Sequence, residues 1–177
     1  MQVRPGSILI AHPVYAQAPH SEAVVFITES NSYSTSGLAL NTPTDYNLHA
    51  LLEPHGIDWQ STDTLYMGGD HYPSAMVMLH TTEWYSSNTM QIDHSLAISS
   101  DDLMIDKLEM GNTPAWYRLF VGCTAWDADD LADQLRSPKP QWLLLSKPSQ
   151  VLIELADANI WHCAIAEYSQ KVFEEYI

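Results

Sequence analysis

Cysteine is scarce in this chain, which has two among 177 residues, Cys123 and Cys163. They stand far apart and form no CxxC motif, so the sequence supports neither a disulfide framework nor a structural zinc site. The apolar run at residues 7–11 is too short for a signal segment or a membrane span. We therefore expect a cytoplasmic location, and an unreactive Cys123 because Arg118 would lie on the opposite face of its strand.

Positive charge is also scarce, since seven Lys and Arg stand against 22 Asp and Glu for a net charge of −15. Such a chain repels phosphates and anionic lipids, which disfavours direct nucleic-acid and membrane binding. Solubility, a basic protein partner and mimicry of nucleic acid all remain explanations of the excess. The oligomeric state cannot be inferred from it.

The common catalytic signatures are missing as well. The sequence has no GxSxG nucleophile turn, no GxxxxGK[ST] phosphate loop and no GxGxxG dinucleotide fingerprint. With 22 acidic residues and no spacing that forces two together, no acid–base pair stands out. We expect no cofactor and assign no catalytic residue.

The composition is that of a folded globular protein, with 46% hydrophobic and 16% charged residues. It predicts one domain over residues 1–177. Short apolar or alternating runs predict strands. These strands are residues 7–11, 23–28, 38–40, 64–67, 75–79, 91–99, 116–121 and 142–145, with an exposed loop at residues 29–37.

Helices are predicted where a capping residue precedes apolar residues at helical spacing. The expected caps are Thr44, Ser99, Asp127 and Asp157. Gly56 and Gly111 are expected to end the first two helices. Strands and helices mix without strict alternation, which indicates an α+β domain with a mixed sheet under several short helices.

The stretch GGDHYPSAMVMLH, residues 68–80, suggests either a metal site or a turn. Asp70, His71 and His80 lack the spacing that brings zinc ligands to one point. We therefore favour a turn in which Gly68 and Gly69 permit positive φ or a close backbone approach. No metal site is predicted. For His80 we favour ring nitrogens bonded to backbone carbonyls over contact with a ligand.

The order of several short segments resembles the AlgH/YqgE family of small bacterial proteins. Each segment is weak alone, and together they run through most of the chain. They are PGSILIAHP, AVVFITE, GLALNTPT, YMGGD, MLH, YRLFVGCTAW with DDLADQL, QWLLL and WHCAI.

The resemblance implies an α+β fold whose mixed, bifurcated sheet curls into a small barrel. It supplies no enzymatic activity or cofactor, because the family is described mainly as regulators. Two family arginines are replaced here, by Glu22 and by Thr42 within Asn41–Thr44. If those arginines bind an anion in relatives, that binding is lost or altered in this chain.

Two kinds of function follow. The first is a non-catalytic regulatory protein that uses an acidic, aromatic-bearing surface on a protein partner, with Trp59, Trp84 and Tyr85 as candidate contacts. The alternative is a hydrolase whose pocket is lined by Asn41, Thr44, Gly68, Gly69 and His80. An accessory component of a larger assembly, a viral one included, is a further reading.

Overall fold

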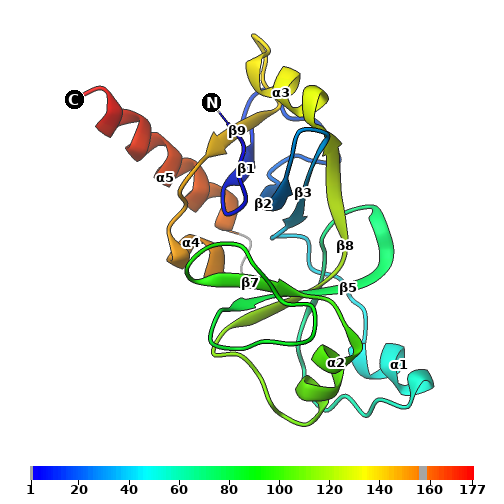
Figure 1. The fold of residues 1–177 in the computed structure, drawn as a ribbon. Helices are drawn as coiled ribbons and strands as arrows, with labels where there is room; N and C mark the ends of the chain where they lie inside the picture. The colour runs from blue at the N-terminus through cyan, green and yellow to red at the C-terminus, as the bar shows by residue number, and fades with distance from the viewer. Residues whose placement is uncertain (1, 156–158) are drawn as a thin grey trace. The chain divides into compact units, whose positions relative to one another are not determined.

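A computed structural model describes residues 2–155 and 159–177, which form two compact units. Unit 1 contains Met1–Asn41 and Thr124–Ile177, and unit 2 contains Thr42–Cys123. Figure 1 labels most of the strands and helices named below. The single domain expected from the sequence stays a prediction.

Unit 1 is built on antiparallel strands in the order β3, β2, β1, β9. The end of β8 adds to β3 through residues 124–127. Leu9, Val25 and Leu144 are among the buried residues of its core. The elements of unit 1 are β1 Ile8–Ala11, β2 Val24–Ser30, β3 Ser34–Ala39, α3 Ala128–Arg136, β9 Trp142–Leu145, α4 Gln150–Glu154 and α5 Ile160–Glu175.

Unit 2 places β5 between β7 and the first part of β8, all antiparallel, while β4 pairs with β8 in parallel. Its separate core includes Trp59, Met78 and Leu119. The elements of unit 2 are α1 Leu48–Leu52, the 3-10 turn η1 Glu53–His55, β4 Leu65–Met67, β5 His71–Thr81, β6 Met90–Gln91, β7 Leu96–Ser99 and α2 Asp102–Glu109, with β8 Tyr117–Asp127 continuing into unit 1.

The α+β class and the mixed sheet are confirmed. Strand β8 changes partners along its length, from β4 and β5 to β3, which is the branching expected of a bifurcated sheet. Runs of buried apolar residues were sufficient to locate β1, β2 and β9. Among the described helices, none combines the length and apolar composition that crossing a bilayer requires.

Two strand predictions were wrong. Residues 29–37 do not form one exposed loop, because β2 and β3 pair through them and the Ser30 and Thr35 hydroxyls lie 2.9 Å apart. Residues 91–99 are not one strand, because Asp93 accepts the backbone N–H groups of Ser95 and Leu96 and turns the chain between β6 and β7. The first prediction failed because the paired residues are polar and turn-prone in sequence. The second failed because the alternation of apolar residues continues across the turn.

Two predicted helix caps were also wrong. Helix α1 begins after Asn47, whose side chain accepts Ala50 N–H, whereas the Thr44 hydroxyl lies before the helix, where it donates to the Leu65 carbonyl and accepts Tyr46 N–H. Helix α2 begins after Asp101, whose carboxylate accepts Met104 N–H, while Ser99 belongs to β7. Asp127 takes the cap position of α3 as expected, but its side chain makes no capping hydrogen bond. The cap expected at Asp157 lies outside the described residues.

Candidate functional site

His80 is the enclosed end of a hydrogen-bonded network in unit 2. It lies near the end of β5 and has no exposed surface. Its Nε2 lies 2.8 Å from Ser99 Oγ on the paired strand β7, and Ser99 Oγ lies 2.7 Å from Thr89 Oγ1. Thr89 Oγ1 accepts the Ser86 backbone N–H at 2.7 Å. Two paired strands and the loop between them are thereby joined through side chains.

This network assigns the proton on the His80 ring. Nδ1 lies 2.9 Å from the Thr81 carbonyl oxygen, which can only accept, so Nδ1 donates. The Ser99 hydroxyl then donates to Nε2, and the Thr89 hydroxyl donates to Ser99 Oγ. That order suits a neutral imidazole. Burial lowers the pKa of His80, against smaller raising effects of the Thr81 carbonyl and the Glu83 charge.

The Ser99–His80 hydrogen bond is the pairing that hydrolases use to activate a serine. A nucleophile must also touch its substrate, yet Ser99 is 1% exposed and His80 is fully enclosed. The Trp84 ring packs edge-on against His80 with centroids 5.1 Å apart. The pair therefore holds β5 and β7 together, and it lends no support to the hydrolase alternative.

Two other residues of the predicted pocket support backbone segments. Asn41 lies in unit 1, where its Oδ1 accepts Val24 N–H at 3.0 Å and its Nδ2 donates to the Glu22 carbonyl at 2.7 Å. Thr44 lies in unit 2 and donates its hydroxyl to the Leu65 carbonyl at 2.7 Å. Their part in a ligand pocket stays a prediction.

The Gly68–Gly69 segment packs against β8. Gly68 N–H donates to the Val121 carbonyl at 2.9 Å. Gly122 has φ 69°, and a Cβ there would press into the Gly69 carbonyl oxygen and lie 3.0 Å from that of His71. This close backbone approach fits the predicted turn. The glycine that permits it is Gly122, because a side chain there would clash with the two carbonyls.

The structure separates the three candidate metal ligands. Asp70 and His71 are exposed and lie side by side, with His71 Nδ1 3.0 Å from Asp70 Oδ1. His80 is enclosed further along β5, and both its ring nitrogens have hydrogen-bond partners. Within residues 2–155 and 159–177, no cluster of three or more His, Cys, Asp or Glu is arranged to hold a metal ion.

Of the three aromatic residues predicted to contact a partner, two are buried. Trp59 is 4% and Trp84 is 6% exposed, and both pack in the core of unit 2. Tyr85 is 71% exposed. Lys107 lies over the Trp84 and Tyr85 rings, 5.1 and 4.5 Å from their centroids, and donates to the Tyr85 carbonyl. Tyr85 alone keeps a surface open to a partner.

The cysteine and arginine of β8 are both restrained by burial. Burial, and then the charge of Asp70, raises the pKa of the half-buried Cys123 thiol, which disfavours the reactive thiolate. This agrees with the expected unreactive thiol. Arg118 is 5% exposed and lies 4.7 Å from the Tyr66 ring centroid. Burial lowers the pKa of Arg118.

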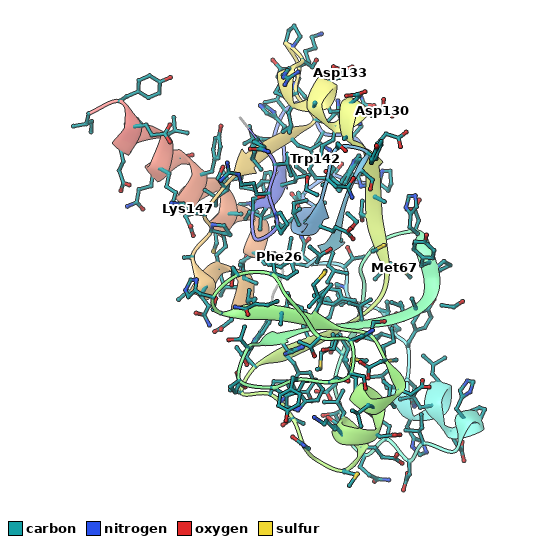
Figure 2. The ribbon with its side chains drawn as sticks, viewed as in Figure 1. Phe26, Met67, Asp130, Asp133, Trp142 and Lys147 are labelled. Atoms are coloured by element: carbon teal, nitrogen blue, oxygen red, sulfur yellow. The ribbon has the colours of Figure 1, made fainter. Side chains whose placement is uncertain are left out.

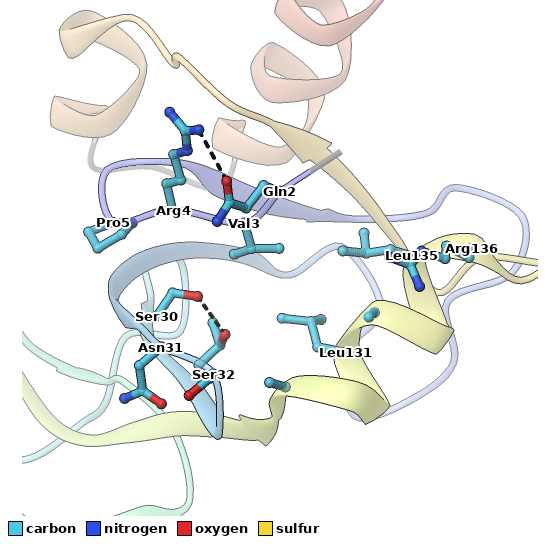
Figure 3. A pocket seen from close by; sticks show the side chains of 13 residues that line it. Gln2, Val3, Arg4, Pro5, Ser30, Asn31, Ser32, Leu131, Leu135 and Arg136 are labelled. Carbon is cyan, nitrogen blue, oxygen red and sulfur yellow. Dashed lines mark hydrogen bonds between the residues drawn. The ribbon is translucent and has the colours of Figure 1, made fainter.

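Unit 1 contains a groove of about 520 Å³ between the N-terminal segment, the β2–β3 turn and α3. Figure 3 shows Val3, Leu131 and Leu135 around this space. The Arg4 side chain points away from α3 and donates to Gln2 Oε1 at 3.1 Å. The groove therefore has apolar surface beneath a polar rim. Of the two arginines that line it, Arg4 points outward.

Unit 2 contains a second groove, of about 540 Å³, between η1, β5 and α2. The apolar residues that line it are buried or half-buried, whereas most of its polar residues are exposed, so the floor is apolar and the rim polar. The floor consists of Leu52, Ile57, Met76, Met104 and Ile105. Asp101, Asp102 and Asp106 lie along the α2 side.

Most of the negative charge has no cationic partner. Between described residues, a lysine or arginine forms a salt bridge with a carboxylate at one place, Lys171 with Glu167. Figure 2 shows Asp130 and Asp133 projecting from α3, where both are exposed. Exposed aspartates without a lysine or arginine partner therefore lie on α3 in unit 1 and, as Asp102 and Asp106, on α2 in unit 2.

Sequence reasoning missed the residues around the second groove. Ser99 and Asp102 were assigned to a helix cap, and Asp101 and Asp106 were passed over. A signal was present, because Asp102, Ile105 and Asp106 stand at i, i+3 and i+4 and thus share one helix face. Nothing local indicated that a cavity would open beside that face.

A family model described as AlgH-like matches residues 8–172. The chain belongs to the AlgH/YqgE family. A UPF0301 protein of Francisella philomiragia is 28% identical to this AlgH-like chain over 156 residues, which cover 84% of the chain and 80% of the relative. A UPF0301 protein of Marinomonas sp. is 27% identical over 149 residues, covering 81% and 78%.

Solved structures share the AlgH-like fold. The solution structure of the AlgH protein from Pseudomonas aeruginosa has a TM-score of 0.77 and 22% identity, covering 95% of this chain and 92% of that one. The crystal structure of protein DIP2367 from Corynebacterium diphtheriae has a TM-score of 0.71 and 20% identity, covering 93% and 86%. At such identities the likeness concerns the fold alone.

Proposed function

We propose that this AlgH-like protein is a non-catalytic regulatory protein that docks on a basic protein partner through an acidic, tyrosine-bearing surface. The observation that carries the proposal is the unneutralised charge. The net charge is −15, and between described residues one Lys–Glu salt bridge is formed, so most carboxylates have no lysine or arginine partner there. Such a field attracts a basic surface over several ångströms and speeds its encounter.

Exposed tyrosines supply the second support. Tyr33, Tyr72 and Tyr85 are 84%, 77% and 71% exposed. Tyrosine is enriched at protein interfaces, because its ring buries a large area and its hydroxyl still finds a hydrogen-bond partner. Tyr72 also has φ 50°, which is uncommon outside glycine and frequent at functional segments. Exposed tyrosines on each unit suit recognition of a protein more than chemistry on a small molecule.

Affinity capture from lysate tests the proposal. The tagged full chain is expected to retain a basic protein at about 50 mM salt and to release it at about 500 mM, because exposed charges are screened beyond the Debye length. Titration of the purified partner at several salt concentrations then measures the dependence.

The control is a chain in which Tyr33, Tyr72 and Tyr85 are replaced by serine at unchanged net charge. Weaker retention by this variant, with the salt dependence preserved, supports the role of the tyrosines. Absence of any captured protein at either salt contradicts the proposed function, and so does a captured partner that is itself acidic.

A further inference from the structure

The groove of unit 2 combines an apolar floor with an acidic side. Leu52 and Met104 are 8% and 1% exposed and are the most buried residues of its floor. Asp102 and Asp106, from helix α2, are exposed beside it. Its volume of about 540 Å³ falls within the range of sites that accept a small ligand or a few side chains.

The two aspartates are one helical turn apart, at i and i+4, with Ile105 on the same face. Like charges at this spacing repel each other and destabilise a helix. Neither carboxylate forms a hydrogen bond or ion pair with another described residue, so the repulsion is unrelieved within the described chain. The negative charge of Asp102 is stabilised by the helix dipole, because Asp102 lies in the first turn of α2. Asp106 lies beyond that turn and gains no such stabilisation.

Asp101 is different, because its carboxylate is fully engaged. Its Oδ1 accepts from Met104 N–H at 2.8 Å and from the Ser86 hydroxyl, and its Oδ2 accepts Asn88 N–H at 2.9 Å. Asp101 therefore fixes where α2 begins. Asp102 and Asp106 are thereby held in place with their carboxylates free for a cation.

The lysine nearest in sequence does not neutralise them. Lys107 lies over the Trp84 and Tyr85 rings and donates to the Tyr85 carbonyl at 2.6 Å. None of the described residues that line the groove is a lysine or arginine. The charge that complements this side must come from another molecule.

We infer that this groove receives a basic amphipathic segment of a protein partner. Apolar side chains of the segment occupy the floor, and its lysines or arginines meet Asp102 and Asp106. This inference rests on the proposed function and locates its contact. Met76 and Met104 suit such an occupant, because their flexible thioethers adapt to different apolar side chains.

The observations favour this occupant over others. A second copy of the chain brings a net charge of −15 and would be repelled. Nucleic acid is excluded from this side by the same charge. A bare metal ion lacks ligands, because the described residues contain no cluster of three or more metal-ligating side chains.

Synthetic peptides on the full chain test the inference. The probe is a peptide of about 14 residues with leucine and lysine at helical amphipathic spacing. One control peptide replaces lysine by glutamate, and another replaces leucine by serine. Methyl NMR of the methionines gives the readout, with Met76 and Met104 in the groove and the exposed Met90 outside its lining.

The leucine–lysine peptide is expected to shift the Met76 and Met104 methyl signals and to leave Met90 unchanged. The double variant Asp102→Asn, Asp106→Asn should weaken its binding about tenfold or more, because two cation contacts are lost. The matched control Asp130→Asn, Asp133→Asn removes the same charge from α3 in unit 1 and should keep the affinity. Both variants are first checked for cooperative melting at or above the temperature of the unaltered chain.

Equal weakening by the two double variants would overturn the inference, because the attraction would then be unspecific. Binding of the leucine–glutamate peptide, or binding without Met76 and Met104 shifts, would overturn it too. If a cellular partner is captured with the expected salt dependence and binds the Asp102→Asn, Asp106→Asn variant with unchanged affinity, the groove assignment fails and the proposed function stands. If no cellular partner is captured at all, the proposed function fails, whatever the peptides do.

Discussion

His80 is a neutral histidine inside a folded unit, and that gives the protein a pH dependence. Burial lowers its pKa, whereas the unfolded chain regains the ordinary value near 6.5. Between the lowered pKa and about 6.5 the unfolded state therefore binds more protons, and stability falls as pH falls through that range. Above about 6.5 the contribution of His80 is complete.

We predict that the free energy of unfolding declines by up to about 1.4 kcal/mol per pH unit below pH 6.5 because of this one group. Replacement His80→Gln should lower stability at pH 7.5 and flatten the decline between pH 6.5 and 5. Urea unfolding at several pH values measures both. The control His94→Gln, at an exposed position, should leave the slope unchanged, and a slope equally steep in His80→Gln would contradict the role given to burial.

At the level of strands and turns, the Gly122 contact makes a sharper prediction. A Cβ at Gly122 would meet two backbone carbonyls, which cannot move aside as a flexible side chain can. We expect Gly122→Ala to cost about 2–3 kcal/mol of unfolding free energy. Gly56→Ala is the matched control, because Gly56 has φ 77° but open space around its Cβ position, so it should cost only about 1 kcal/mol. Equal losses in the two variants would mean that φ alone matters.

The same elements indicate what a single sequence can reveal. The strand β1, ILIA, was predictable because every residue is apolar and buried, so local composition and tertiary environment agree. Of strand β3, STSGLA, only the apolar end at Leu38 and Ala39 was predicted, because its polar residues are held by pairing with β2 and β8 on both sides. Position between two partner strands overrides propensity, and position is a property of the whole fold.

The candidate sites follow the same division. His80 was recognisable as a histidine near a strand end, but its partner Ser99 is set by the pairing of β5 with β7, which joins residues nineteen positions apart. Trp59 and Trp84 were placed at the surface because their sequence neighbours are loop-like, yet both fill the core of unit 2. Burial of an aromatic residue in a loop depends on what packs over it, which local sequence does not encode.

The charge of the whole molecule leads to the last prediction. A net charge of −15 repels itself in the compact state, and salt screens that repulsion. We expect the melting temperature to rise between about 20 and 300 mM sodium chloride, by about 2–4 °C for each kcal/mol relieved. Calorimetry at constant pH measures the rise.

A charge-reduced variant makes that measurement specific. Glu29→Lys, Asp45→Lys, Glu175→Lys alters exposed positions in both units and changes the net charge from −15 to −15 + 6 = −9. Because self-repulsion grows with the square of the charge, the rise with salt should fall to roughly a third or a half. An equal rise in both proteins would show that salt acts on apolar burial instead. The repulsion between surface carboxylates would then not destabilise the fold, and binding of a basic partner would not stabilise the protein by relieving that repulsion.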